Sequence, residues 1–429
     1  MKKILLLAFL GIFGQVGAQS YFPPVTGSQW DTLSPTRFGI RQSDIDSAIN
    51  FLASYDTKAF IVLKDGKILH EHYFGSFTAD SAWYWASAGK SLTAFGVGMA
   101  QFQGRLSIQD SSSRYLGTGW TSLTPAQEGQ IKIWHQLTMT SGLNDGVPDD
   151  NCDSPACLQY LAPVGTRWAY HNAPYRLLHD VVGASANQSW QAFFNQQISA
   201  RTGISGLWID HVLYSKARSM ARFGLLMLNK GVWNGDVLLG DTAYLNAMIR
   251  PSQNLNKSYG YLWWLNGQDN FMMPQSQIQF SGSLIPAAPA ELVMGLGKND
   301  QKLYLLPSRN IVVIRMGNGS NLPVPVLFDR DFWNYLPAIL PANGLAVSQT
   351  STTTLKAYPN PASTSLQLEL PEGRYALSWF DLSGKKVTTA ELHGTQVTEL
   401  PSANGLYLLV AERIETGERF HTKIAIQHP

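Results

Sequence analysis

Strand-like segments occur at both ends of a long region of this 429-residue chain, and helix-like segments fill its middle. The strand patterns cover residues 59–63, 68–74, 291–297, 303–306 and 311–316. The helical patterns cover residues 90–101, 174–182, 191–200 and 217–228. Asp65-Gly66 stands between the first two strand segments and suits a type I′ hairpin turn. The order predicts one sheet that is assembled from both ends of the region and flanked by helices.

The chain changes character near residue 346. Residues 348–354 are polar and lack the large apolar side chains that a packed core needs, as in a linker. After them, residues 366–370 and 423–426 alternate apolar and polar side chains, which predicts a small all-β sandwich. We therefore expect a main domain at 19–345, a linker at 346–356 and a second module at 357–429.

The N-terminus has the pattern of a secretory signal peptide. Two lysines precede an apolar run over residues 4–13, and Val16-Gly17-Ala18 supplies small residues at a cleavage site. We expect residues 1–18 to be removed, so that the mature protein begins near Gln19. No later stretch has the roughly 18 uninterrupted apolar residues of a membrane helix, so no stable membrane span is predicted.

Charge and cysteine content narrow the possible partners. Charged residues make up 14% of the chain and the formal net charge is +2, which gives no sign of a nucleic acid or anionic membrane as partner. Cys152 and Cys157 are the two cysteines of the chain, and export favours a local disulfide between them. Two free thiols are the alternative reading. No metal site is expected there, because two ligands rarely suffice.

Ser87-Ala88-Gly89-Lys90 is the first candidate for catalysis. If a helix begins near Ser87, Lys90 lies one turn further on the same face and its amine can reach the hydroxyl. A lysine acts as a base only if its pKa falls from about 10.4 toward neutrality, a change of roughly 4 kcal/mol that burial can supply. Residues 83–85, Trp-Tyr-Trp, are candidates for that burial. Spacing alone is weak evidence, because Ser383-Gly384-Lys385-Lys386 has it too, and a capping serine with a solvated lysine is the alternative.

The wider sequence makes the catalytic reading stronger. Six segments from 87–94 to 259–264 resemble, in the right order, the serine β-lactamase and D-alanyl-D-alanine carboxypeptidase family, particularly its class C-like esterase and amidase branch. They are residues 87–94, 104–110, 137–143, 163–172, 220–224 and 259–264. The likeness spans roughly residues 40 to 335. It implies an α+β fold with an antiparallel sheet flanked by helices, and a serine hydrolase that needs no cofactor.

The resemblance also assigns roles to residues around Ser87. The family's Tyr-x-Asn element falls on Tyr170-His171-Asn172, which implies that Tyr170 shares the proton transfers and that Asn172 binds the acyl group. A packed tyrosine with a turn-forming asparagine is the alternative. Tyr244-Leu245-Asn246 has the same spacing, but we interpret it as an ordinary helix segment.

The family's third element falls on Lys298-Asn299-Asp300. We expect this segment on an edge strand that faces Ser87, where Lys298 would bind a substrate carboxylate; a turn lysine is the alternative. Asp300 replaces the expected glycine on the same strand face and would neutralise Lys298, which favours a neutral ester or amide substrate. By analogy, the backbone N–H groups of Ser87 and Gln301 would form the oxyanion hole.

The C-terminal module resembles a type IX secretion sorting domain. The likeness rests on residues 358–362, 380–385 and 405–410. It implies export through the periplasm and across the outer membrane by the type IX machinery, to the cell surface or the medium. A carbohydrate-binding or adhesive sandwich is the alternative.

Two function classes remain after these readings. The first is a secreted hydrolase that forms an acyl-enzyme on Ser87 and acts on a small ester, amide or short peptide. The second is a catalytically silent penicillin-binding-like protein that binds cell-wall or peptide ligands. No G-x-S-x-G motif supports an α/β-hydrolase, and His70-Glu71-His72 has no evident third metal ligand.

Overall fold

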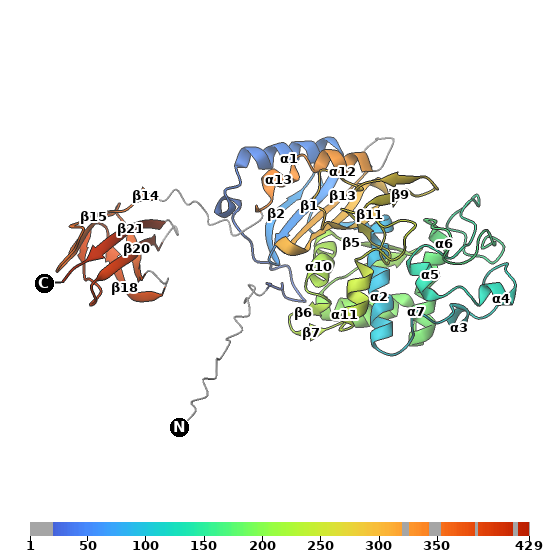
Figure 1. The fold of residues 1–429 in the computed structure, drawn as a ribbon. Helices are drawn as coiled ribbons and strands as arrows, with labels where there is room; N and C mark the ends of the chain where they lie inside the picture. Colours follow the sequence, from blue (N-terminus) through green and yellow to red (C-terminus); the bar gives the residue numbers. More distant parts are fainter. Residues whose placement is uncertain (1–19, 320–325, 343–352, 382–384, 415–418, 429) are drawn as a thin grey trace, which may run out of the picture. The chain divides into compact units, whose positions relative to one another are not determined.

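The computed structural model of the protein describes residues 20–319, 326–342, 353–381, 385–414 and 419–428. The predicted signal peptide and most of the predicted linker lie outside these residues. The chain divides into two compact units, which meet in the sequence between Leu340 and Pro341 (Figure 1). The domain boundaries at residues 345 and 357 stay predictions. In the described part of the chain, no helix is both long and apolar enough to cross a membrane.

The larger unit is built on a six-stranded sheet, in the order β2-β1-β13-β12-β11-β8, whose neighbouring strands are all antiparallel. Its strands are β1 (Thr57–Lys64), β2 (Lys67–Tyr73), β8 (Trp264–Leu265), β11 (Val293–Gly297), β12 (Gln301–Leu306) and β13 (Ile311–Gly317). Asp65 and Gly66 both have positive φ between β1 and β2, as a type I′ turn requires. The predicted sheet, assembled from both ends of the region, is confirmed.

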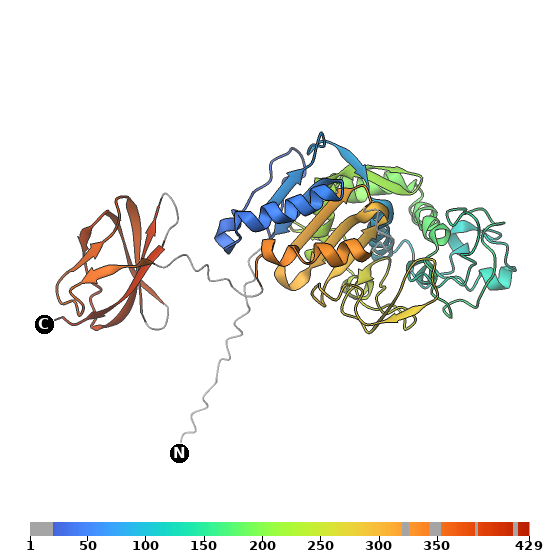
Figure 2. The same cartoon turned by 90° about the horizontal axis from the view of Figure 1, so that it is seen from above.

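Helices cover both faces of this sheet (Figures 1 and 2). One face carries α1 (Gln42–Ser54), α12 (Val326–Phe332) and α13 (Leu336–Ile339). The other carries α10 (Ala217–Leu228), which packs on β1, β12 and β13, with α2 (Lys90–Phe102) beside it. Both α2 and α10 were expected from their apolar periodicity.

The remaining helices of the larger unit are shorter, and those that come first along the chain form a largely helical region beyond α2 (Figure 1). They are α3 (Ser113–Leu116), α4 (Pro125–Glu128), α5 (Ile133–Leu137), α6 (Asn172–Arg176), α7 (Leu178–Ala186), α8 (Trp190–Phe194), α9 (Ala200–Thr202) and α11 (Thr242–Met248). The expected helix at 174–182 is divided at Leu177, and the one at 191–200 contains a π-helical turn at Asn195–Ser199. Tyr244 lies in α11, in agreement with its interpretation as helix.

Three small sheets complete the larger unit. They are β3 (Ala82–Tyr84) with β5 (Val212–Lys216) and β4 (Leu207–Ile209), β6 (Val232–Trp233) with β7 (Asp236–Val237), and β9 (Asn270–Met272) with β10 (Gln279–Ser281). The first is important for the site, because β3 leads directly to Ser87.

The C-terminal unit is a β sandwich, as predicted. One sheet has the order β14-β21-β20-β17-β18 and the other β15-β16-β19. The strands are β14 (Thr353–Thr354), β15 (Lys356–Tyr358), β16 (Leu366–Glu369), β17 (Arg374–Phe380), β18 (Lys386–His393), β19 (Gln396–Thr398), β20 (Gly405–Arg413) and β21 (Arg419–Ile426). Leu366 and Leu368 of the smaller sheet share one buried cluster with Trp379, Leu409 and Ile424 of the larger. The two sheets therefore enclose a common core.

Candidate active site

Ser87 lies in a turn that is fixed from both sides. β3 ends at Tyr84, a 3₁₀ turn covers Ala86–Gly89, and α2 follows from Lys90. Trp85 anchors the turn, because its backbone N–H bonds to Leu213 and its indole N–H donates to Ser215 at 2.7 Å. Ala86 has φ of +47°, a left-handed conformation that is costly for a residue with a Cβ. The packed Trp85 and the strained turn together present Ser87 to a pocket.

Lys90 contacts Ser87 directly. Its side-chain amine lies 3.0 Å from the Ser87 hydroxyl oxygen, and the residue is only 4% exposed. The amine sits over the rings of Tyr170, at 5.1 Å, and Tyr175, at 4.2 Å. These two rings lie against the amine, which forms no cation–π contact with the Trp-Tyr-Trp run at 83–85 in the part of the chain that the structure describes.

Burial lowers the pKa of Lys90 from 10.5 to about 7. Arg176 lowers it further by charge repulsion, whereas Asp150 raises it. A substantial fraction of Lys90 is therefore a neutral amine at neutral pH. A neutral amine beside the hydroxyl is the base that a serine nucleophile needs.

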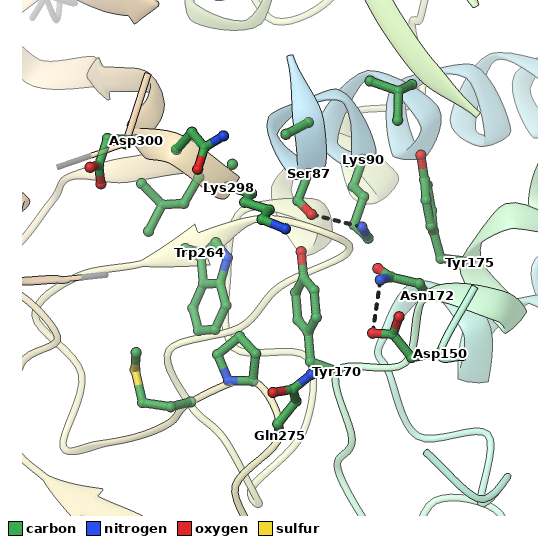
Figure 3. A pocket seen from close by; sticks show the side chains of 18 of the residues that line it. Ser87, Lys90, Asp150, Tyr170, Asn172, Tyr175, Trp264, Gln275, Lys298 and Asp300 are labelled. Carbon is green, nitrogen blue, oxygen red and sulfur yellow. Dashed lines mark hydrogen bonds between the residues drawn. The ribbon is translucent and has the colours of Figure 1, made fainter. Parts of the chain in front are cut away.

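Tyr170 lies beside both Ser87 and Lys90, and its hydroxyl is directed toward Ser87 (Figure 3). Its ring stacks on Trp264, with centroids 5.8 Å apart. Burial raises the pKa of Tyr170 above its usual value, although a hydrogen bond with Ser87 offsets part of this shift. Tyr170 is thus a neutral phenol, able to pass a proton on but not to act as a standing phenolate base.

Asn172 begins α6 and faces the same pocket. Its side-chain N–H donates to Asp150 at 3.0 Å, while its side-chain carbonyl is buried and has no partner among the described residues. Asp150 belongs to the loop that carries the Cys152–Cys157 disulfide, which is present as predicted. The loop therefore supplies a carboxylate that the sequence reading did not identify.

The segment 298–300 departs from its expected conformation. β11 ends at Gly297, and Lys298–Asp300 form a 3₁₀ turn to β12, in which Asn299 and Asp300 both have positive φ. Because the chain reverses here, Lys298 and Asp300 do not share a strand face. The placement of these residues on an edge strand was wrong.

The turn separates the charges of Lys298 and Asp300. Asp300 is buried and forms an ion pair with Lys302 at 3.2 Å. Figure 3 shows the Lys298 amine directed toward Ser87 and Tyr170, with Asp300 far to the side. Lys298 has no ion pair among the residues that the structure describes. The expected neutralisation of Lys298 by Asp300 is therefore wrong.

Gln301 lies behind this turn. Its side-chain amide donates to the carbonyls of Asn299, at 2.9 Å, and Gly317, at 2.6 Å, and Gln301 is not among the residues lining the pocket. Gly297 lines the pocket instead, and a Cβ added to it would lie 2.5 Å from the Trp85 carbonyl. The position of Gln301 gives no support to its predicted oxyanion role.

The pocket itself has a volume of about 700 Å³. Part of its wall is apolar and is formed by Trp264, Met273, Pro274, Leu284 and Leu296. Its polar lining includes Ser87, Lys90, Asp150, Tyr170, Asn172, Tyr175, Arg176, Asp210, His211 and Lys298. Sequence reasoning missed Asp150, Tyr175, Arg176, Asp210 and His211. Tyr175 and Arg176 could have been found from the sequence, because they lie within one helical turn of Asn172 and so can face the same pocket.

Two family models match the chain. Residues 53–212 match the beta-lactamase family, and residues 356–427 match the secretion system C-terminal sorting domain. An uncharacterized protein of Alkalihalophilus pseudofirmus strain OF4 is 23% identical over 305 residues, which cover 61% of this chain and 84% of that protein.

Solved structures share the fold at low sequence identity. A proposed 6-aminohexanoate-dimer hydrolase from Bacillus anthracis has a TM-score of 0.55 and 18% identity, over 72% of this chain and 87% of that one. A penicillin-binding protein homolog from Caulobacter crescentus has a TM-score of 0.56 and 13% identity, over 73% and 100%. The octameric penicillin-binding protein homologue from Pyrococcus abyssi has a TM-score of 0.52 and 14% identity, over 90% and 96%.

The two matches agree with the two units of the structure and with the resemblance of each to its family. The chain therefore contains a beta-lactamase family domain, with the fold of penicillin-binding proteins and related hydrolases, followed by a C-terminal sorting domain that directs it through type IX secretion to the cell surface or the extracellular space.

Proposed function

We propose that this protein is a serine hydrolase that cleaves an amide or ester bond through an acyl-enzyme on Ser87. The observation that carries the proposal is the 3.0 Å contact between the Ser87 hydroxyl and the Lys90 amine, whose pKa burial lowers to about 7. A buried lysine with a near-neutral pKa next to a pocket serine is costly for stability and suits a general base.

Acylation begins with proton transfer from the Ser87 hydroxyl to the neutral Lys90 amine. The Ser87 oxygen forms a bond to the substrate carbonyl carbon, and the carbonyl oxygen takes up negative charge. When the bond to the leaving group breaks, the Tyr170 hydroxyl gives its proton to the leaving nitrogen or oxygen and recovers one from the Lys90 ammonium. Water then attacks the acyl-enzyme by the same route in reverse.

The developing oxyanion needs backbone donors close to Ser87. We assign one to the N–H of Ser87 itself, a pocket residue in the turn before α2. We assign the second to the end of β11 at Gly297, in place of Gln301. The support is the close packing of Gly297, whose added Cβ would lie 3.1 Å from the Ala88 nitrogen.

The charge of Lys298 indicates the kind of leaving group. Its amine points into the pocket, and it is not neutralised by Asp300, which pairs with Lys302. A substrate carboxylate on the leaving-group side would supply the missing counter-charge. We therefore revise the expected neutral substrate to an amide or ester that bears a carboxylate. The 6-aminohexanoate dimer named for the Bacillus anthracis structure is an amide of this kind.

Intact-mass spectrometry tests the proposal. The mature protein and Ser87→Ala are incubated with a fluorophosphonate probe and, separately, with a penicillin. A Ser87-dependent adduct with the probe supports the hydrolase, and an adduct with both reagents extends it to penicillin recognition. If neither reagent labels Ser87, the protein is instead a silent binding relative.

A further inference from the structure

The pocket has two chemically different ends. Lys298 enters it from the turn after β11, whereas Asp150 enters it from the disulfide-bearing loop next to α6. Figure 3 shows Lys298 and Asp150 on opposite sides of Tyr170, with Ser87 and Lys90 between them. A substrate that spans the nucleophile therefore meets a cation at one end and a carboxylate at the other.

Asp150 differs from the other acidic residues of the pocket in its partners. Asp210 pairs with Arg176 at 2.5 Å, and Asp329 pairs with Lys302 at 2.6 Å. Asp150 accepts a hydrogen bond from the neutral amide of Asn172 and forms no ion pair with any residue that the structure describes. A half-buried carboxylate without a counter-ion, in the wall of a pocket, is suited to a cationic ligand group.

We propose that Asp150 binds an ammonium group on the acyl part of the substrate, so that the preferred substrates are aminoacyl amides or esters. This inference rests on the function proposed above. The acyl side is chosen because Asp150 is hydrogen-bonded to Asn172, the residue proposed to bind the acyl group, whereas Lys298 serves the leaving group. A substrate that places an ammonium at Asp150 and a carboxylate at Lys298 carries both charges, so the preferred substrate is zwitterionic.

Binding of an ammonium group to Asp150 also favours the neutral form of Lys90, which acts as the base. The Asp150 carboxylate raises the pKa of Lys90 and so favours the protonated, inactive amine. An ammonium bound to Asp150 balances that charge. Binding of an aminoacyl substrate therefore weakens the field that holds Lys90 in its protonated form, and a substrate without the ammonium does not.

Matched substrates isolate the contribution of the ammonium. We would compare kcat/KM for glycyl, β-alanyl, 4-aminobutyryl and 6-aminohexanoyl p-nitroanilides with that for the acetyl, propionyl, butyryl and hexanoyl counterparts. None of these carries a carboxylate, so Lys298 does not bias the comparison. The wild type should favour the amino member by roughly tenfold to a hundredfold at the chain length that reaches Asp150.

The variant Asp150→Asn is nearly isosteric and keeps an acceptor for Asn172. It should bring the ratio of amino to desamino substrate to about one, and near neutral pH the rate on the desamino member should rise rather than fall, because the Asp150 charge no longer favours the protonated Lys90. Asp210→Asn is the matched control, because Asp210 lines the same pocket but is already paired with Arg176. A ratio that is equal in the wild type and Asp150→Asn at every chain length overturns the inference.

A second readout does not depend on turnover of these anilides. Hexylamine, but not hexanol, should slow the fluorophosphonate labelling of Ser87, and this protection should disappear in Asp150→Asn and persist in Asp210→Asn. Equal protection by both ligands overturns the assignment of Asp150 while the hydrolase proposal stands. Failure of the probe to label Ser87 at all removes the proposed function, and this inference with it.

Discussion

The side-chain amine of Lys302 lies 2.6 Å from the carboxylate of Asp329, and both residues are buried. Asp300 lies 3.2 Å from the same amine, and the Tyr304 hydroxyl donates to Asp329. The cluster joins the turn that carries Lys298 to α12. We therefore expect replacements of Lys298 and Lys302, which are four residues apart, to have different consequences.

Lys302→Met should destabilise the larger unit by about 3–5 kcal/mol, because it leaves buried carboxylates without their counter-ion. Urea unfolding of the mature protein, followed by tryptophan fluorescence, measures the change. Lys298→Met, whose amine faces the pocket, should alter the free energy of unfolding by less than about 0.5 kcal/mol. Equal losses in the two variants would contradict this account of the cluster.

Lys298→Met should instead weaken the binding of anionic substrates. For an amide with a carboxylate on its leaving group, we expect KM to rise roughly tenfold to a hundredfold, the range for a charge-assisted hydrogen bond. The methyl ester of the same substrate should show little change. Steady-state kinetics on the pair checks this, and a similar rise in KM for both would count against a carboxylate contact.

The activity should depend on pH through Lys90. The base acts as the neutral amine, so kcat/KM should rise with pH and level off above the pKa of about 7. Below that value it should fall about tenfold per pH unit, as expected for one proton. A profile recorded between pH 5 and 9 on a substrate without titratable groups tests this. A flat profile across that range would exclude Lys90 as the base.

The same shift in pKa predicts that Lys90 destabilises the fold. The folded-state pKa lies below the usual 10.5, so the unfolded chain binds the proton more readily. The resulting loss of stability is fully present below about pH 7, and it disappears as the pH rises toward 10.5. Lys90→Met should therefore be more stable than the wild type, by a few kcal/mol near pH 7 and by progressively less at alkaline pH.

Thermal or urea unfolding at pH 7 and pH 9.5 compares the two proteins. Lys90→Met should also lose the Ser87 adduct with the fluorophosphonate, which separates it from an ordinary stabilising substitution. If Lys90→Met is less stable than the wild type, or if its advantage in stability grows with pH, then burial of Lys90 does not destabilise the fold.

Predictions from the sequence were correct where interactions between residues close in the chain determine the structure. Asp65 and Gly66 supply the two residues with positive φ that a type I′ turn requires, and α10 spans the residues 217–228 that its apolar periodicity predicts. The spacing of Ser87 and Lys90 likewise predicts their contact, because residues three apart meet across one helical turn.

Predictions from the sequence were less accurate where tertiary packing determines the conformation of a segment. Nothing in Lys298-Asn299-Asp300 shows that β11 ends one residue earlier, because the turn is held by distant groups such as Arg315, which donates to the carbonyls of Asn299 and Asp300 at 3.0 Å. Asp150 escaped notice for the same reason. Its proposed role depends on the folding of a loop against Asn172, which no spacing in the sequence reveals.

Gly297 offers a steric test of how β11 is placed against the nucleophile. Its φ is −126°, which any residue adopts, so alanine adds no backbone strain at this position. The added Cβ would nevertheless lie 2.5 Å from the Trp85 carbonyl, and β11 would have to move away from the turn that holds Ser87. We expect Gly297→Ala to cost about 1–3 kcal/mol of stability and to slow Ser87 labelling on the order of a hundredfold.

Gly295→Ala is the matched control on the same strand. Its added Cβ would lie 3.3 Å from the Ser91 hydroxyl and 3.4 Å from the Ala88 carbonyl, contacts that small adjustments can relieve. Labelling by the fluorophosphonate should then stay within a few-fold of the wild type. If Gly297→Ala reacts as fast as Gly295→Ala, the end of β11 does not shape the oxyanion site, and the second donor must lie elsewhere in the pocket.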